Sequence, residues 1–323
     1  MERRFGALLV LASCLPFALA GIFTRLVTAD LWTLLAWRGL VGGAAITLYA
    51  LRVEGRAPMG RTGWTLALVG AAASVCYLGA FRLAPVAHVA LIYALAPFAA
   101  AGLALVTGGQ TGGRGVLAAA CISLAGVALV AGGGGGAHWA GDALALCMTL
   151  LMALTAVIIR ARPRAPVLRA MAASALPLAA TGLVLGDPWS VSTRDAILMT
   201  AFAATFALAV ILLTEGAKRL PAAQVTLLGG AEVPLAVALG VVLLGEIPPP
   251  TTLVGGALVL VAVLWQARVE MRAGCDLSEK NRRADRAMVM DPTPNHDFPN
   301  ITDRSGICPA KPRTWPRPHR VRQ

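Results

Sequence analysis

The chain has 323 residues, of which 57% are apolar and only 14% are charged, and its mean hydropathy is +0.72. Soluble globular domains carry about 25% charged residues, so this composition excludes a water-soluble globule. The net charge is +12, but the basic residues form no dense run with interleaved aromatic residues. Nucleic-acid binding is therefore not expected, and we interpret the excess of Arg and Lys as a signal of membrane orientation.

Apolar stretches of about 20 residues, the length a helix needs to cross a bilayer core, fill the first 270 residues. Charged residues, prolines and glycine runs divide this part of the chain into ten predicted spans. They cover residues 5–27, 31–51, 62–81, 85–107, 114–131, 140–159, 165–185, 195–215, 222–244 and 251–267. The sequence therefore predicts an all-α integral membrane protein with ten transmembrane helices.

The charges that flank these spans test the count, because Lys and Arg accumulate on the cytoplasmic side of a membrane. With the N-terminus inside, fourteen basic residues flank the inner ends of the spans and three flank the outer ends. The inner ones are Arg3, Arg4, Arg52, Arg56, Arg61, Arg114, Arg160, Arg162, Arg164, Arg169, Lys218, Arg219, Arg268 and Arg272, and the outer ones are Arg25, Arg82 and Arg194. This bias predicts a multi-pass protein of the cell (inner) membrane with both termini in the cytoplasm.

The two halves of the chain resemble each other at a nearly constant offset. Residues 82–110 match residues 218–246 at an offset of 136, so that Pro85 corresponds to Pro221. Because five spans per half is an odd number, the second half enters the membrane from the opposite side, and the spans form two inverted five-helix repeats. Secondary transporters commonly have this architecture, and a duplicated helical bundle without a transport role is the alternative.

The predicted organisation is a first repeat (residues 1–131), a glycine-rich linker (132–139), a second repeat (140–272) and a tail (273–323). The tail has seven prolines in its last fifty residues, mixed charges and almost no apolar periodicity. Such a composition is typical of disorder, so we expect a disordered cytoplasmic tail.

Several short motifs resemble the EamA-like branch of the drug/metabolite transporter superfamily. They are Trp37-Arg38, Ala94-Leu95-Ala96-Pro97, Gly141-Asp142, Leu220-Pro221, Glu232-x-Pro234 and Leu244-Gly245-Glu246. The resemblance covers about residues 5–266 and depends on the ten spans, the repeat and the order of the motifs together. It implies a ten-helix inner-membrane carrier of small metabolites, by family tendency an exporter. The alternative is a non-transporting membrane bundle, such as an assembly partner or a lipid-interacting protein.

Two ionisable residues inside the spans are the main candidates for substrate binding or coupling, because a charge near a helix centre costs about 2.5–3.5 kcal/mol on insertion scales. Glu232 lies near the middle of the ninth span and is a candidate proton or cation site, with a structural carboxyl group as the alternative. Arg38, in the second span, is a candidate to bind a substrate carboxylate or phosphate through its planar fork of donors. Pairing with Glu232 and snorkelling to the interface are the alternatives for Arg38.

Three further polar residues are weaker candidates for the same site. His88 and Gln224 occupy equivalent positions in the two repeats and are candidates for the mouth of a substrate cavity, with helix capping as the alternative. Tyr93 faces a different side of its helix from His88 and is a candidate phenolic hydrogen-bond donor to the substrate.

Other residues are predicted to shape the helices rather than to bind substrate. Pro97 and Pro234 are candidates for kinks, because proline lacks the N–H of a helical hydrogen bond. Gly39 and Gly43 form a small-residue face that allows a neighbouring helix to approach closely. Glu246 is predicted to cap a helix or to pin a loop.

The sequence contains no motif for a nucleophile, a phosphate-binding loop or a metal site. We therefore expect no enzymatic activity, no cofactor and no metal. The expected partners are a small-molecule substrate and the lipid bilayer, with protons as an open alternative, and the expected assembly is a monomer or a homodimer.

Overall fold

The computed structural model describes residues 2–55, 58–106, 114–132, 138–162, 165–220, 222–265 and 268. Contacts divide the chain into one unit of residues Met1–Val269 and a second of residues Glu270–Gln323. All described residues belong to the first unit. The predicted tail, residues 273–323, and most of the predicted linker, residues 133–137, lie outside the described residues.

Every regular element within these ranges is a helix, as the sequence predicts. The elements are α1 (Glu2–Leu26), α2 (Leu31–Trp37), η1 (Arg38–Gly42), α3 (Gly43–Val53), α4 (Gly60–Leu83), α5 (Val86–Tyr93), α6 (Ala96–Val106), α7 (Arg114–Gly132), α8 (Trp139–Ala161), α9 (Val167–Leu185), α10 (Thr193–Ala217), α11 (Ala222–Gly229), α12 (Glu232–Leu244) and a last apolar helix, Pro250–Trp265.

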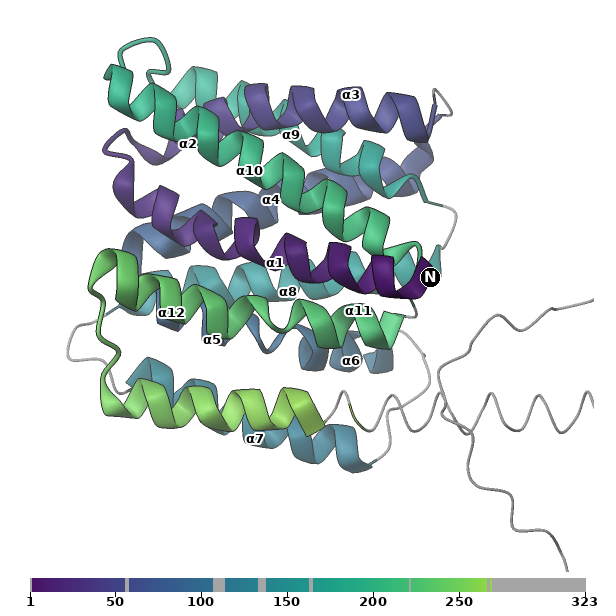
Figure 1. Ribbon diagram of the computed structural model, residues 1–323, viewed down its shortest axis with the longest axis vertical. Helices are drawn as coiled ribbons and strands as arrows, with labels where there is room; N and C mark the ends of the chain where they lie inside the picture. Colours follow the sequence, from purple (N-terminus) through teal and green to yellow (C-terminus); the bar gives the residue numbers. More distant parts are fainter. Residues whose placement is uncertain are drawn as a thin grey trace, which may run out of the picture. The chain divides into compact units, whose positions relative to one another are not determined.

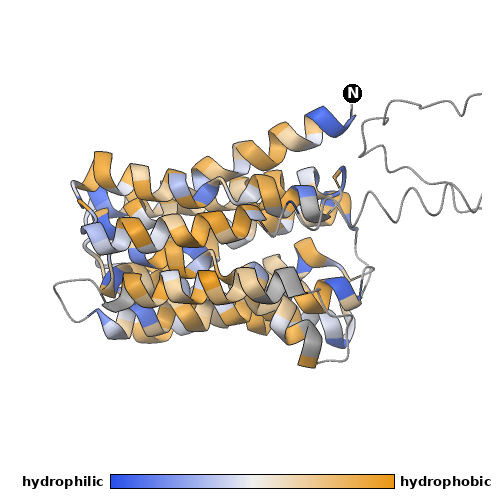
Figure 2. Cartoon of the chain, turned by 90° about the horizontal axis from the view of Figure 1, so that it is seen from below, coloured by the Kyte–Doolittle hydropathy of each residue, from blue (hydrophilic) through white to orange (hydrophobic). Residues whose placement is uncertain are grey.

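The described part of the chain contains eight helical segments that are long and apolar enough to cross a membrane. The predicted fifth and tenth spans correspond to α7 and to the last helix, whose described apolar stretches are Ala118–Val130 and Pro250–Trp265. Large apolar side chains such as Leu8, Leu68 and Leu208 are exposed on the helices, and hydrophilic residues gather at the two helix ends (Figure 2). Such a surface is suited to lipid rather than water, so the chain is a multi-pass membrane protein.

Helices from before and after the glycine run pack against one another (Figure 1). Helix α1 packs along α10, and α4 packs along α8 and α9. The segment α2–η1–α3 also packs on α9, while α12 packs on α1 and α5. The main helix contacts therefore join the two halves of the sequence.

The buried apolar side chains concentrate where the two halves meet. The largest cluster includes Phe81 of α4, Val89 of α5, Met148 of α8 and Val233 of α12. A second cluster contains Leu34, Leu78, Leu178 and Phe202, which come from α2, α4, α9 and α10.

Three of the predicted spans are not continuous α-helices. In the fourth span α5 ends at Tyr93 and α6 begins at Ala96, and in the ninth span α11 ends at Gly229 and α12 begins at Glu232. The second span contains the five-residue π-helix η1, which the sequence analysis did not predict. Short π-helical turns frequently occur at functional positions.

Candidate functional site

The breaks in the fourth and ninth spans have matching backbone hydrogen bonds. The bonds, written from N–H to C=O, are Leu95 to Ile92 and Ala99 to Leu95 in the first half, and Ala231 to Leu228 and Leu235 to Ala231 in the second. The two sets are separated by the same offset of 136 residues. Pro97 and Pro234 lie in the first turn of the helix that follows each break, where the missing N–H of proline is tolerated.

A small cavity lies beside these breaks, at the contact between the two halves. Its lining comes from α1 (Phe17 and Ala18), α4 (Tyr77 and Phe81), α5 (Val89, Ala90 and Tyr93) and α12 (Glu232, Val233 and Ala236). The lining is mostly apolar and aromatic, with three polar side chains. Small-molecule sites usually combine an apolar wall with a few polar groups in this way.

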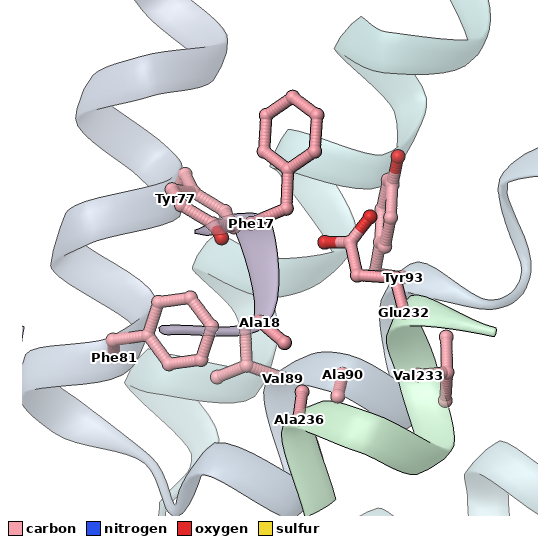
Figure 3. A pocket seen from close by; sticks show the side chains of 10 residues that line it. All are labelled: Phe17, Ala18, Tyr77, Phe81, Val89, Ala90, Tyr93, Glu232, Val233 and Ala236. Atoms are coloured by element: carbon pink, nitrogen blue, oxygen red, sulfur yellow. The ribbon is translucent and has the colours of Figure 1, made fainter. Parts of the chain in front are cut away.

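Glu232 is the first residue of α12 and brings the carboxylate into this cavity (Figure 3). Its side chain points between Tyr77 and Phe17, and the ring of Tyr93 lies beside it. Among the described residues, its carboxylate has no hydrogen bond and no ion pair. The N-terminal end of a helix favours negative charge. Glu232 therefore lies at a position that suits a carboxylate, although no described basic side chain pairs with it.

Cys14 of α1 contacts the C-terminal end of α11, at the break in the ninth span. Its Sγ atom lies 3.6 Å from the carbonyl oxygen of Leu228 and 3.8 Å from that of Gly229. The last carbonyl groups of a helix have no partner within the helix, so this thiol serves as an external donor. The sequence analysis did not identify this contact.

Arg38 lies at the start of η1 and is only 6% exposed. It forms no ion pair with Glu232, which was one of its predicted alternatives. Its guanidinium group stacks on the ring of Phe206, 3.8 Å from the ring centroid, and the ring of Phe206 lies 5.9 Å from that of Phe17, which lines the cavity. The structure thus connects Arg38 to the aromatic wall of the cavity, although Arg38 is not among the lining residues.

His88 is 2% exposed and joins α5 to two other helices. Its Nδ1 atom lies 3.3 Å from Oδ1 of Asp142, and its Nε2 atom lies 3.4 Å from Oγ1 of Thr252. Gln224 is half-buried in α11. Neither His88 nor Gln224 is among the ten residues that line the cavity.

Gly39 and Gly43 face α9, as the small-residue pattern predicts. A Cβ atom at Gly39 would lie 2.8 Å from the backbone nitrogen of Ala179 and 2.9 Å from the carbonyl oxygen of Ala175. A Cβ atom at Gly43 would meet the side chain of Ala175. The two glycines therefore let η1 and the start of α3 approach α9 closely next to Arg38.

At the end of the helices opposite the N-terminus, Asp195 fixes the connection between α1 and α2. Its carboxylate accepts hydrogen bonds from the backbone nitrogens of Thr28 and Ala29, both at 3.2 Å, and from Oγ1 of Thr28 at 2.5 Å. Arg82 donates to the carbonyl oxygen of Ala29 over 2.7 Å. These contacts join α10 and α4 to the same loop.

Asp30 in this loop is the N-cap of α2. Its carboxylate accepts hydrogen bonds from the backbone nitrogens of Trp32, at 2.8 Å, and Thr33, at 3.0 Å. Partial burial raises the pKa of this carboxyl group, but the hydrogen bonds from Thr33 and Trp32 outweigh that effect and hold the pKa below its ordinary value. The carboxylate is therefore the form that caps the helix.

Glu246 pins the same end of the protein, as the sequence analysis predicted. It forms an ion pair with Arg25 at 3.2 Å and accepts a hydrogen bond from the backbone nitrogen of Val86 at 2.9 Å, which caps α5. Arg25 also donates to the carbonyl oxygen of Ala84 over 2.7 Å. Its repeat equivalent, Gln110, lies outside the described residues.

The sequence matches the family model of the EamA-like transporters over residues 4–132 and again over residues 139–267. No curated protein matches the chain. One similar solved structure, titled only "Crystal structure of protein", is 20% identical to it, with a TM-score of 0.60 over 81% of this chain and 97% of that chain. At this identity the likeness shows a shared fold.

The fold is a bundle of helices that can span a membrane, and a transporter family model matches the sequence twice. Together these findings define a multi-pass membrane transporter. The chain belongs to the EamA-like transporter family, which confirms the resemblance to drug/metabolite transporters. Within the described ranges, no group of three or more His, Cys, Asp or Glu residues could hold a metal ion.

Proposed function

We propose that the protein is a secondary-active carrier of small organic metabolites that works by alternating access between two inverted five-span repeats. The observation that carries this proposal is the pair of equivalent helix breaks beside the cavity that holds Glu232. Discontinuous helices near the membrane midplane commonly form the substrate and ion sites of transporters with inverted repeats.

Reciprocal contacts between helices support the inverted repeat and the ten-span count. A Cβ atom at Gly126 would lie 2.6 Å from the carbonyl oxygen of Gly255, and one at Gly255 would meet the carbonyl oxygen of Gly126. The Cβ atom at Gly126 would also lie 2.9 Å from Cγ2 of Val259, and the one at Gly255 would lie 2.9 Å from Cγ2 of Val130. Such an exchange of partners is typical of two antiparallel helices, and an inverted repeat makes the fifth and tenth spans antiparallel.

The same reciprocity occurs between the second and seventh spans. Gly39 and Gly43 correspond to Ala175 and Ala179 at the offset of 136. Gly39 contacts Ala179, the equivalent of Gly43, and Gly43 contacts Ala175, the equivalent of Gly39. A pseudo-two-fold axis between the halves accounts for this crossing.

Export across the inner membrane, with both termini in the cytoplasm, is the proposed direction, and the charge bias of the loops supports this orientation. Glu232 is the proposed coupling residue. A carboxyl group without a partner inside a membrane span can carry a proton when it is exposed alternately to the two sides. The proposed assembly is a monomer or a homodimer.

The test is efflux from liposomes that contain purified protein and a pooled set of labelled amino acids, purines, sugars and cationic drugs, with and without a pH gradient. Selective, saturable efflux is expected, and the gradient should increase it. Glu232→Gln should lose the response to the gradient but keep exchange of substrate, because the amide carries no ionisable proton. Glu215→Gln, near the cytoplasmic end of α10, is the matched control and should keep the response.

A response to the gradient that is unchanged in Glu232→Gln would refute proton coupling through this residue. Folded wild-type protein that moves none of the solutes would favour the non-transporting bundle instead.

A further inference from the structure

The guanidinium group of Arg38 is a poorly compensated buried charge in the described part of the chain. Its side chain is 6% exposed, and its Nε and Nη1 atoms are buried without a hydrogen-bond partner. It has no ion pair with any described residue. A buried charge is costly unless it is paired and hydrogen-bonded, so a group with this setting is a candidate to receive an anion from outside the chain.

The backbone around Arg38 holds the side chain in place. Gly39 and Gly42 follow it in the π-helix, and a Cβ atom at Gly42 would lie 3.1 Å from the carbonyl oxygen of Ala203. Helices α9 and α10 therefore pack directly against η1. Arg38, Gly39 and Gly42 are all buried in this π-helix. The position of the guanidinium group therefore depends on helix packing and not on an acidic partner.

Aromatic side chains connect Arg38 to the cavity. One face of the guanidinium group stacks on Phe206 at 3.8 Å, and the ring of Phe206 lies 5.9 Å from that of Phe17. Because Phe17 lines the cavity, a flat, apolar solute in an enlarged cavity would reach Arg38 along this aromatic wall.

We propose that Arg38 binds the carboxylate of the transported solute, so that the substrate class is small organic monoanions with an apolar body. This assignment rests on the proposed function. A single guanidinium group neutralises one negative charge, so a dianionic phosphate would remain undercompensated. The free Nε and Nη1 donors are suited to carboxylate oxygens.

The test compares four probes with different head groups on an aromatic body: phenylacetate, phenyl phosphate, phenylacetamide and phenethylamine. Each is titrated against the purified full-length protein in detergent, and the unfolding midpoint is recorded, because a ligand of the folded state raises that midpoint. Phenylacetate should stabilise the wild type more than the other three. This comparison needs no variant.

Variants then assign the effect to Arg38. Arg38→Gln should weaken phenylacetate binding at least about tenfold, the effect expected from loss of a charge-assisted hydrogen bond. Arg38→Lys keeps the charge, which guards against loss of folding, and should bind more weakly than the wild type because the planar fork is gone. The matched control is Arg219→Lys, whose arginine already pairs with Glu215 and which should bind like the wild type.

Equal phenylacetate binding by the wild type and Arg38→Gln would overturn the proposal. So would equal stabilisation by the neutral amide, tighter binding of phenyl phosphate, or no stabilisation by phenylacetate at its solubility limit. Liposome efflux separates this proposal from the proposed function. Efflux of other solutes without carboxylate binding would refute only the Arg38 site, and Arg38-dependent binding without efflux of any solute would refute only transport.

Discussion

At the scale of single residues, carboxylates fix the connections between helices. Asp195 is 3% exposed and holds the loop before α2 through three hydrogen bonds. Glu54 accepts hydrogen bonds from the backbone nitrogens of Leu168, at 3.2 Å, and Arg169, at 3.1 Å, at the start of α9. In both cases a charged acceptor satisfies backbone donors that have no partner within a helix.

Replacement of Asp195 tests this role. Asp195→Ala leaves the donors of Thr28 and Ala29 unsatisfied, and we expect a loss of about 1.5–3 kcal/mol in the free energy of unfolding. Thermal unfolding of the purified protein in detergent measures the effect as a lower midpoint. The control is Asp187→Ala, because Asp187 is exposed and its carboxylate has no hydrogen bond among the described residues. Equal midpoints for the two variants would contradict the role of Asp195.

At the scale of elements, glycine positions decide which helices come into contact. Gly126 of α7 and Gly255 of the last helix place their backbones against each other. Small residues allow such contacts in membranes, where association depends on close packing rather than on the hydrophobic effect. The fifth and tenth spans therefore have a defined crossing point.

A pair of Gly→Ala variants tests the crossing. Gly126→Ala places a methyl group 2.6 Å from the carbonyl oxygen of Gly255, and we expect destabilisation of about 1–3 kcal/mol. Gly102→Ala in α6 meets no atom within 4 Å and should stabilise its helix by about 0.5–1 kcal/mol. An unchanged or raised unfolding midpoint for Gly126→Ala would show that the close contact does not form.

At the scale of the whole molecule, the loops sort into two ends. The contacts of Asp195 with Thr28, of Arg82 with Ala29 and of Arg25 with Glu246 join four connections at the end opposite the N-terminus. Glu54 joins α3 to α9 near the N-terminal end. Connections at odd and even positions along the chain thus gather at opposite ends, the arrangement expected of a chain that crosses a membrane repeatedly.

The inverted repeat has a direct test in the loops that follow the second and seventh spans. These loops are equivalent in the two repeats, so an inverted repeat places them on opposite sides of the membrane, whereas a parallel repeat places them on one side. Pro58→Cys and Ser190→Cys introduce a thiol at exposed positions in these loops. In intact cells an impermeant maleimide should label only Ser190→Cys, with the unmodified chain as the blank. Labelling of both variants or of Pro58→Cys alone would contradict the proposed orientation.

The sequence located the candidate polar residues but not their surroundings. Glu232 and Arg38 were visible because a charge inside an apolar span is unusual. Phe17, Tyr77 and Phe206 were missed, since an aromatic residue that lines a cavity has the same sequence signal as one that faces lipid. The contacts of Cys14 and His88 were missed for a similar reason, because their partners lie on helices far away in the sequence.

The sequence by itself determined the helical class, the segment boundaries to within a few residues, the family and the internal repeat, because hydropathy and loop charge are local properties of a chain in a membrane. Only the tertiary structure decided where the fourth and ninth spans break, that η1 is a π-helix, and that Arg38 stacks on Phe206 instead of pairing with Glu232. These features depend on which helix faces meet, and close packing between the two halves sets those faces.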